Sequence, residues 1–388
     1  MAKLESQDDE QLFEAEVLRV ARALWVPNRP FQGSVILDGA ERDGIFVGDD
    51  IVAVVEATVS KRLDKAKKDG DKLKQASERL SKSHPLKAIK GYFVTRDEPT
   101  AEQRQYINSL RSGVVACSFA QLRSLLINSR EYLNVRQAYA FGSARNLDTG
   151  APKDLDVYVP IGLLEESTSG RARVHSVADI ANRMSSGGTT VLLGDFGAGK
   201  SMTIREVHSR LASSHLKNPE KRFPVTLNLR DHQGQKAPDE ALRRHCQAIG
   251  FEEGTKLVRA WRAGQVDILL DGFDEIATTG WLSQAVSLRQ IRRNSVELIR
   301  NFTDQTPDGA GIFLTGRRHL FDSNTELSGA LGISSRNPLV LSTDDFSEAQ
   351  VTEYLTARGW DGSLPGWLPP RPPTTRLPVN FRSHRANH

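Results

Sequence analysis

The sequence predicts an α/β protein of two modules: a parallel sheet sandwiched by helices, preceded by a smaller module that also mixes strands and helices. Three observations support this. The apolar run Thr190–Leu193 precedes a glycine-rich loop and a helical segment, the apolar run Val266–Leu270 ends in acidic residues, and residues 10–115 alternate strand-like and helical patterns. Short apolar runs that alternate with helical periodicity are typical of sheets covered by helices.

The glycine-rich loop carries the most specific motif of the chain. Residues 194–201 fit the pattern G-x-x-x-x-G-K-[ST], and residues 202–211 continue with a helical pattern. In such a loop, backbone N–H groups and the helix N-terminus bind phosphate oxygens. We expect Lys200 to reach the outer phosphates of a nucleotide and the Ser201 hydroxyl to bind Mg²⁺. The predicted nucleotide-binding residues are Gly194, Asp195, Phe196, Gly197, Ala198, Gly199, Lys200, Ser201 and Met202.

Acidic residues follow the apolar run Val266–Leu270. Asp271 comes directly after it, at the edge of the sheet where ligands bind in open parallel sheets. In that position Asp271 can hold the Mg²⁺ that bridges nucleotide phosphates. Glu275 is placed to polarise a water molecule for attack on the terminal phosphate, and Asp274 is a second candidate.

A further strand is predicted to end beside the same site. Residues 311–314 are apolar and are followed by Thr315 and Arg317. A Thr and an Arg at the tip of a strand next to the acidic one could sense or stabilise a terminal phosphate. The alternative is a strand that ends in a solvated arginine.

These residues resemble a known family. The run 271–275, in which a glycine follows the first acid and two acids come later, resembles the NACHT branch of the STAND signalling NTPases. Residues 223–231, 314–317 and 346–355 resemble that family's second strand, sensor strand and first helix of its small helical subdomain. The resemblance covers residues 155–365. It implies ATP and Mg²⁺ as cofactors, Arg317 as the sensor of the terminal phosphate, and a homo-oligomer on activation.

The smaller module has its own order of elements. Apolar residues recur at helical spacing over 9–25, and a long polar helix rich in Lys and Arg is predicted over 61–83. Strands are predicted at 35–37, 44–47, 50–58 and 89–95, and a further helix at 100–110. The sequence therefore predicts a compact α/β module over residues 1–135.

Two carboxylates of this module are candidates for chemistry. Asp43 precedes a strand, and Glu56 lies near the end of an apolar strand, where a lone carboxylate is costly without a partner or a metal. Two acids on adjacent strands can hold a Mg²⁺ that activates water for phosphodiester hydrolysis. The arrangement resembles the restriction-endonuclease-like fold of PD-(D/E)xK nucleases over residues 10–115, and this implies DNA or RNA as a partner.

The resemblance has one departure. Thr58 stands where that motif has its lysine, two residues after Glu56. We expect Lys61, or Lys65 one helical turn later, to reach back to the acids, and Glu16 is a candidate to complete the metal site. Two alternatives stay open: the module has lost catalysis and only binds nucleic acid, or the acids and the basic helix are simply solvated.

Gly142-Ser143 and the alternating acids Asp154 and Asp156 have the outline of a nucleotidyltransferase. Little chain remains before the phosphate loop for the rest of that fold. We therefore interpret residues 136–165 as a connector that ends in the first strand of the larger module, Val157–Pro160.

Composition is consistent with a globular protein of the cytoplasm. The chain has 388 residues, 38% apolar and 26% charged, with a net charge of +4, which is too mild to imply nucleic acid by itself. No apolar stretch is long enough to span a bilayer, the N-terminus is not a secretory signal, and two cysteines are too few for a disulfide framework. We expect a cytoplasmic location and no membrane partner.

The predicted organisation is therefore an effector at 1–135, a connector at 136–165, a NACHT NTPase at 166–340, the start of a helical subdomain at 341–362 and a flexible Pro- and Arg-rich tail at 363–388. The tail suggests a chain truncated or frame-shifted near residue 370. The favoured function is a signalling ATPase that controls a nuclease-like effector in prokaryotic antiphage defence. The alternatives are a nucleotide-dependent scaffold with a catalytically dead effector, and a metabolic ATPase or kinase.

Overall fold

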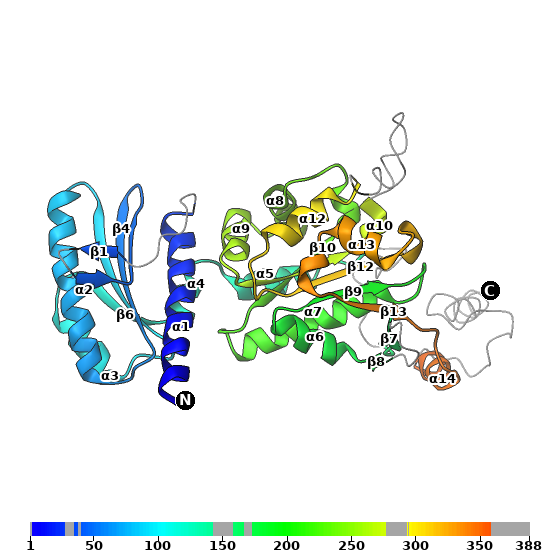
Figure 1. The fold of residues 1–388 in the computed structure, drawn as a ribbon, viewed down its shortest axis with the longest axis horizontal. Helices are drawn as coiled ribbons and strands as arrows, with labels where there is room; N and C mark the ends of the chain where they lie inside the picture. The colour runs from blue at the N-terminus through cyan, green and yellow to red at the C-terminus, as the bar shows by residue number, and fades with distance from the viewer. Residues whose placement is uncertain are drawn as a thin grey trace, which may run out of the picture. The chain divides into compact units, whose positions relative to one another are not determined.

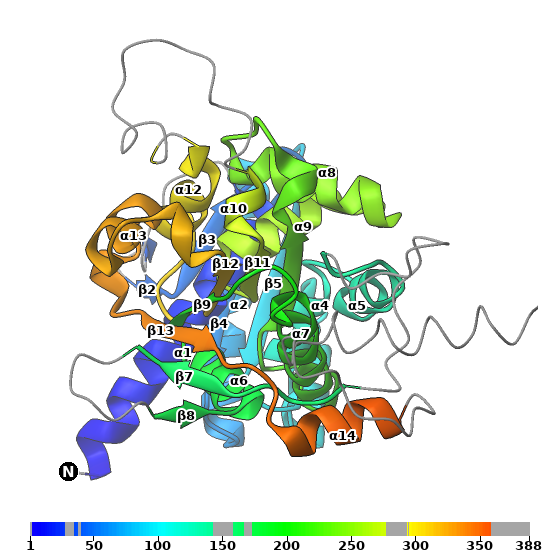
Figure 2. The same cartoon turned by 90° about the vertical axis from the view of Figure 1, so that its right-hand side faces the viewer.

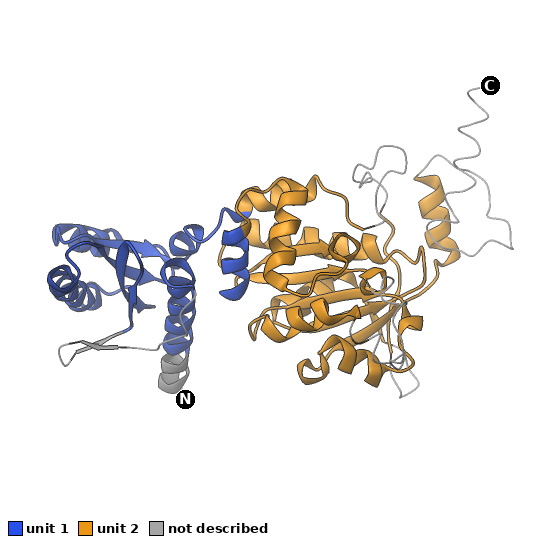
Figure 3. Ribbon diagram, turned by 90° about the horizontal axis from the view of Figure 1, so that it is seen from above, with its two compact units in different colours: residues 1–129, 255–263 blue, residues 130–254, 264–388 orange. Residues whose placement is uncertain are grey.

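The computed structural model describes residues 2–27, 35–37, 40–142, 158–166, 173–276, 293 and 295–357. Two compact units emerge (Figure 3). Unit 1 comprises Met1–Ser129 and Thr255–Ala263, and unit 2 comprises Arg130–Gly254 and Gly264–His388. The predicted tail at 363–388 and the acids Asp154 and Asp156 lie outside the described residues.

Unit 1 is a four-stranded sheet in the order β3-β4-β5-β6 between helices (Figure 1). β3 is antiparallel to β4, whereas β4, β5 and β6 run parallel. Helix α2 packs its apolar residues, such as Leu73 and Leu80, against Val52, Val54 and Phe93 of the sheet. The strands of unit 1 are β1 (Val35–Leu37), β2 (Ala40–Arg42), β3 (Gly44–Val47), β4 (Ile51–Thr58), β5 (Ala88–Thr95) and β6 (Val114–Ser118). The helices of unit 1 are α1 (Ala2–Trp25), α2 (Leu63–Ser83), α3 (Ala101–Ser109), α4 (Phe119–Ser124) and most of α9 (Gly254–Arg262).

Most predicted elements of the smaller module agree with these bounds to within two residues, whereas α1 begins seven residues before its predicted start at 9. The helix predicted at 100–110 begins after Thr100, whose side chain accepts a hydrogen bond from the Gln103 amide in a capping box. The sequence reasoning missed β2, β6, α4 and α5 (Ser129–Gln137).

Unit 2 is built on a seven-stranded sheet in the order β10-β11-β12-β9-β13-β7-β8. The first five strands in this order run parallel, and β7 and β8 join antiparallel at one edge (Figure 2). Helices α6 and α7 cover one face of the sheet, and α8 and α12 lie on the other (Figure 1). The strands are β7 (Leu163–Glu165), β8 (Val174–His175), β9 (Thr189–Leu193), β10 (Phe223–Asn228), β11 (Val266–Asp271), β12 (Ile312–Gly316) and β13 (Leu339–Thr343). The helices, with α5, are α6 (Val177–Ser185), α7 (Lys200–Lys217), α8 (Pro238–Ile249), α10 (Phe273–Ile276), α12 (Glu297–Gln305), α13 (Asn324–Leu331) and α14 (Glu348–Thr356), with short 3₁₀ turns at Leu229–His232, Arg318–Leu320 and Ser334–Arg336.

This topology confirms the predicted parallel sheet between helices. Strand β12, which ends in Thr315 and Gly316, lies between the phosphate-loop strand β9 and the acidic strand β11, and β10 lies on the far side of β11. One prediction is wrong: residues 158–160 form no strand, and the sheet gains β7 at 163–165 instead. Pro160 cannot donate to a ladder, which is a physical reason for pairing to begin later.

Candidate functional site

The phosphate loop joins β9 to α7, as predicted. Gly199 caps α7 with a φ of +79°, a left-handed conformation that favours glycine. The Lys200 ammonium folds back on the loop and donates to the Gly194 carbonyl at 2.7 Å and the Asp195 carbonyl at 2.9 Å. Burial lowers the pKa of Lys200, and the nearby carboxylates of Asp274 and Asp271 oppose that shift. The loop thus presents a partly desolvated cation where phosphates are expected.

Asp271 lies at the carboxyl end of β11 and is only 4% exposed. The Thr315 hydroxyl, from the neighbouring strand β12, donates to Asp271 Oδ1 at 2.5 Å. Burial raises the pKa of Asp271, while hydrogen bonds from Thr315 and Ser201 oppose the shift. Among the described residues, Oδ2 of Asp271 has no hydrogen-bond partner. A buried carboxylate oxygen without a partner, next to a serine hydroxyl, fits a hard cation such as Mg²⁺.

The other predicted residues of this site are held in ion pairs. Arg230, in the 3₁₀ turn that follows β10, donates from Nε to Glu275 Oε2 at 2.6 Å and from Nη2 to Oε1 at 2.8 Å. Arg317 Nε lies 2.9 Å from Asp274 Oδ2, and its guanidinium lies 5.7 Å from the centre of the exposed Phe196 ring. Glu275 and Arg317 are therefore at the site, but each is bound to a partner.

Three residues that the sequence reasoning missed lie beside these. Arg230 holds Glu275, Asn228 stands opposite Asp271 in the register of β10 and β11, and Gly142 packs against Asp271 and Ser201. Arg230 and Asn228 lie in the segment compared with the family's second strand, yet neither has a spacing signature. Gly142 carries a signal in the sequence, the Gly-Ser pair at 142–143, although the sequence favours a connector there.

The acids of unit 1 also meet. β3 pairs with β4 so that Gly44 faces Val55, and one further step of this register puts Asp43 opposite Glu56. The Ala57 amide donates to Asp43 Oδ2 at 2.7 Å. Glu56 is 1% exposed, and burial together with the charge of Asp43 raises the pKa of Glu56 to about 8, although Lys72 opposes the shift. Burial likewise raises the pKa of Asp43.

The lysine at these acids is neither of the predicted ones. Lys72, on α2, donates to Glu56 Oε2 at 3.0 Å. Lys61 instead pairs with Asp97 at 2.8 Å on the surface, and Lys65 lies 3.3 Å from the buried Asp69. The sequence cannot reveal this, because the distance between Glu56 and Lys72 is set by how α2 packs on the sheet.

Glu16 and Thr58 are the other two residues that the sequence analysis considers for this cluster. Glu16 is exposed on α1, so its side chain does not face the buried acids. Thr58 is fully buried, and its hydroxyl accepts a hydrogen bond from the Ser60 amide at 3.1 Å. Within the described ranges, no group of three or more His, Cys, Asp or Glu side chains is arranged to hold a metal ion.

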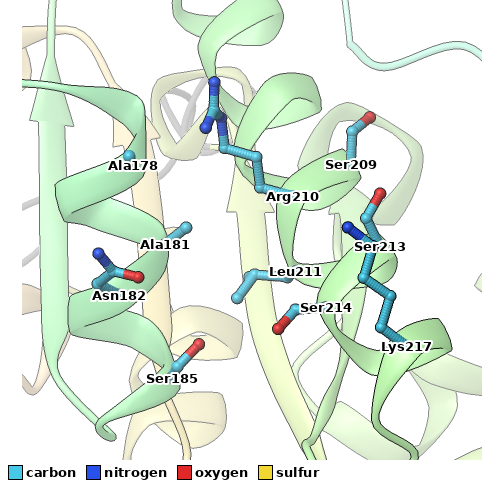
Figure 4. A pocket seen from close by; sticks show the side chains of 10 residues that line it. All are labelled: Ala178, Ala181, Asn182, Ser185, Ser209, Arg210, Leu211, Ser213, Ser214 and Lys217. Carbon is cyan, nitrogen blue, oxygen red and sulfur yellow. The ribbon is translucent and has the colours of Figure 1, made fainter.

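A cavity of about 400 Å³ opens between α6 and α7 (Figure 4). Small and polar side chains line it, including Ala178, Asn182, Ser213 and Lys217. It shares no residue with the phosphate loop, and we assign it no ligand.

Comparisons with known proteins agree with the larger site. Residues 188–359 match the family model described as the NACHT domain. Over these residues the chain is therefore similar to the NACHT domain, and this similarity implies a nucleotide-hydrolysing NTPase of the signalling type that binds nucleotide with a divalent metal. No curated protein matches the chain. No helix in the described ranges is long and apolar enough to cross a membrane.

Solved structures similar to the chain include two Aeropyrum pernix ORC proteins and a domain of a replication initiation protein. The Aeropyrum pernix ORC1 protein in complex with DNA is 16% identical with a TM-score of 0.32, covering 54% of this chain and 54% of that one. The Aeropyrum pernix ORC2 protein in its ADP form is 12% identical with a TM-score of 0.31, covering 50% and 54%. Domain III of the Thermotoga maritima replication initiation protein DnaA is 13% identical with a TM-score of 0.28, covering 53% and 71%. The chain thus spans about half the length of the two ORC proteins, and at these TM-scores we base nothing on the likeness.

Proposed function

We propose that this protein is an ATP-dependent signalling NTPase whose NACHT domain controls a nuclease-like N-terminal unit. The observation that carries the NTPase part is the meeting of Lys200, Ser201 and Asp271 at one edge of the sheet, within the residues that match the NACHT model. Lys200 would exchange its loop carbonyls for phosphate oxygens. Ser201 and Asp271 would hold Mg²⁺, which supplies charge neutralisation at the phosphates when bound.

Hydrolysis is then proposed to require Glu275 to turn from Arg230 toward a water molecule. The two hydrogen bonds at 2.6 and 2.8 Å hold both carboxylate oxygens toward the guanidinium, so the carboxylate must reorient to polarise a water molecule at the terminal phosphate. Arg317 is tied to Asp274 in the same way, and its release would free a guanidinium to contact a terminal phosphate. Nucleotide hydrolysis is therefore proposed to be slow until these pairs rearrange.

The nuclease part of the proposal rests on Asp43, Glu56 and Lys72. Asp43 is half-buried directly before β3, and Glu56 is buried on the neighbouring strand β4. Glu56 Oε1 is among the described buried oxygens that have no hydrogen-bond partner. Lys72 brings an ammonium to within 3.0 Å of Glu56 from helix α2. We propose that Lys72 does the work that the motif assigns to a lysine two residues after the second acid, which here is Thr58. Asp43 and Glu56 would hold Mg²⁺, which activates water when bound.

The test is cleavage of supercoiled plasmid and of single-stranded RNA by the full chain with Mg²⁺ and ATP. Three variants are compared with the wild type: Glu56→Gln, Lys72→Ala and, as the matched control, Lys61→Ala, whose lysine pairs with Asp97. We expect cleavage to fall by at least about 100-fold in the first two variants and to stay near wild type in the control. Loss of cleavage in Lys61→Ala with retention in Lys72→Ala would overturn the assignment of the lysine.

A second function is favoured by one observation. The described residues contain no ready three-ligand metal cluster, and Lys72 neutralises Glu56 directly. A unit with this charge balance could bind nucleic acid or a partner without cutting, so that the NTPase acts as a nucleotide-loaded scaffold. Absence of cleavage by the wild type, with nucleotide-dependent retention of DNA or RNA on a filter, would support the scaffold.

The resemblance to prokaryotic signalling NTPases extends the proposal to antiphage defence in the cytoplasm and to a homo-oligomer on activation. Light scattering of the purified chain with ADP or with a non-hydrolysable ATP analogue tests the oligomer. Phage plating on cells that express the wild type or Lys200→Ala tests the role in defence.

A further inference from the structure

A glycine outside the phosphate loop lies where the metal is expected. Gly142 has a φ of +48°, and a β-carbon built on it would overlap Asp271 Oδ2 and lie 2.7 Å from Ser201 Oγ. These are the two side chains that would hold Mg²⁺. The backbone of Gly142 therefore covers the buried carboxylate oxygen that has no hydrogen-bond partner in the described part of the chain.

Two hydrogen bonds from one side chain fix this backbone in place. The Gly142 amide donates to Asn228 Oδ1 at 2.8 Å, and Asn228 Nδ2 donates to the Ala140 carbonyl at 3.1 Å. Asn228 is 5% exposed and stands opposite Asp271 in the sheet. The segment Ala140–Gly142 is thus docked on the end of β10 as a strap across the site.

A buried arginine anchors the same strap. Arg136, on α5, has no exposed surface, and it donates from Nε to the Thr226 carbonyl at 2.9 Å and from Nη1 to the Tyr139 carbonyl at 2.9 Å. Its guanidinium lies 3.7 Å from the centre of the Phe141 ring. Arg136 also interacts electrostatically with Asp271. Arg136, which anchors the strap, therefore brings a positive charge near the carboxylate of Asp271.

We propose that the segment Ala140–Gly142 is an autoinhibitory strap, which must leave Asp271 and Ser201 before Mg²⁺-nucleotide binds fully. Docking of the strap and of the metal are mutually exclusive, because both use the space beside the same two oxygens. Nucleotide alone is expected to occupy the phosphate loop, since the atoms nearest a β-carbon on Gly142 belong to Asp271 and Ser201. This inference rests on the proposed nucleotide site.

The chain supplies a route from the strap to the rest of the protein. Helix α5 begins at Ser129, which is the last residue of the first segment of unit 1 (Met1–Ser129). The helix ends at Gln137, five residues before Gly142. Release of the strap would remove one anchor of the segment that joins the two units. The metal-loaded state of the NTPase would thus be coupled through covalent continuity to the N-terminal unit.

The experiment measures binding of a fluorescent non-hydrolysable ATP analogue to the full chain, with Mg²⁺ and with EDTA. Gly142→Ala expels the strap by steric overlap. Asn228→Ala removes both hydrogen bonds between Asn228 and the strap, together with the longer one to Asp231 Oδ2, without adding an atom. We expect each variant to bind the analogue with Mg²⁺ roughly tenfold more tightly than the wild type, and to differ little from it in EDTA. Gly250→Ala is the matched control, because Gly250 has a φ of +79° and open space around it.

Hydrogen exchange provides a readout that does not depend on the variants. In the wild type, a peptide covering residues 138–142 should exchange faster after addition of the Mg²⁺-analogue, although a ligand at a site usually slows exchange. Weaker Mg²⁺-dependent binding by both variants, or slower exchange at 138–142, would show that the segment completes the site instead of blocking it. Failure of the wild type to bind the analogue at all would overturn the nucleotide site itself, and the strap with it.

Discussion

Asp271 in unit 2 and Glu56 in unit 1 are similar carboxylates with different cations. Each lies on a parallel strand, is almost fully buried and has a pKa raised by burial, and each has one oxygen without a hydrogen-bond partner among the described residues. The cation beside Asp271 is Lys200, which is tied to loop carbonyls, whereas Lys72 donates directly to Glu56. At the NTPase site, phosphate oxygens can thus replace the loop carbonyls as partners of Lys200. In the acid cluster, Glu56 already has Lys72 as its counter-ion.

This difference reflects how each site is specified. The phosphate loop places Lys200 and Ser201 by local backbone geometry, so a pattern of eight residues locates them. The position of Lys72 depends on the packing of α2 against β4 and β5, which no short pattern contains. Local motifs therefore predict the first site better than the second.

The largest effect on activity is expected for Glu275, the residue proposed to polarise the attacking water molecule. Glu275→Gln should lower the rate of ATP hydrolysis by about 10² to 10⁴, because the amide cannot accept a proton from water. Binding of the ATP analogue should stay within a few-fold of the wild type. A phosphate-release assay measures the rate, and hydrolysis retained by the variant would remove Glu275 from the mechanism.

The second largest effect is expected for Lys200, the cation of the phosphate loop. Lys200→Ala should weaken nucleotide binding by about 100-fold, since charge-assisted bonds to phosphate are lost. Titration with the fluorescent analogue measures the affinity. Lys217→Ala is the matched control, because Lys217 is an exposed lysine near the other end of the same helix. Equal losses in both variants would indicate a general effect of charge rather than a phosphate contact.

The pH dependence of stability should distinguish the acid cluster. The pKa of Glu56 is about 8 in the folded protein, above its ordinary value of 4.5, so the native state binds this proton more tightly than the unfolded state. The contribution of Glu56 to stability is therefore present below pH 4.5 and is lost as pH rises toward 8. The slope is at most about 1.4 kcal/mol per pH unit.

Chemical denaturation without metal at pH 5 and pH 8, in the wild type and in Glu56→Gln, isolates this term because other groups cancel. The wild type should lose more stability between the two values than the variant does. Parallel behaviour of the two proteins would mean that Glu56 titrates normally and is not buried as described.

The smallest effect concerns the ion pair that holds Glu275. Arg230→Ala should reduce the free energy of unfolding by about 1 kcal/mol, because a bidentate, partly buried pair is lost. Arg210→Ala removes a more exposed pair with Glu206 and should cost at most about 0.5 kcal/mol. Urea denaturation compares them, and a larger loss for Arg210→Ala would contradict the assigned geometry.

Much of the fold follows from the sequence because periodicity and caps are local. The sequence predicts strands β9, β10, β11 and β12 of unit 2, the phosphate loop and the position of Asp271, and it predicts β4, α2 and β5 of unit 1. It does not predict β7, β8 and β13. The ion pairs of Glu275 and Arg317 could not be foreseen, since their partners depend on which strand ends meet. Gly142 was visible as a Gly-Ser pair, but only the folded chain brings it to Asp271, which lies far from it in the sequence.

The most direct test of the central claim is whether nucleotide at unit 2 controls cleavage by unit 1. Plasmid cleavage with Mg²⁺ is measured for the wild type and Lys200→Ala, each with and without ATP. We predict that ATP raises the cleavage rate of the wild type at least several-fold and leaves Lys200→Ala unchanged. Equal cleavage rates with and without ATP in the wild type would contradict control of the N-terminal unit by the NTPase.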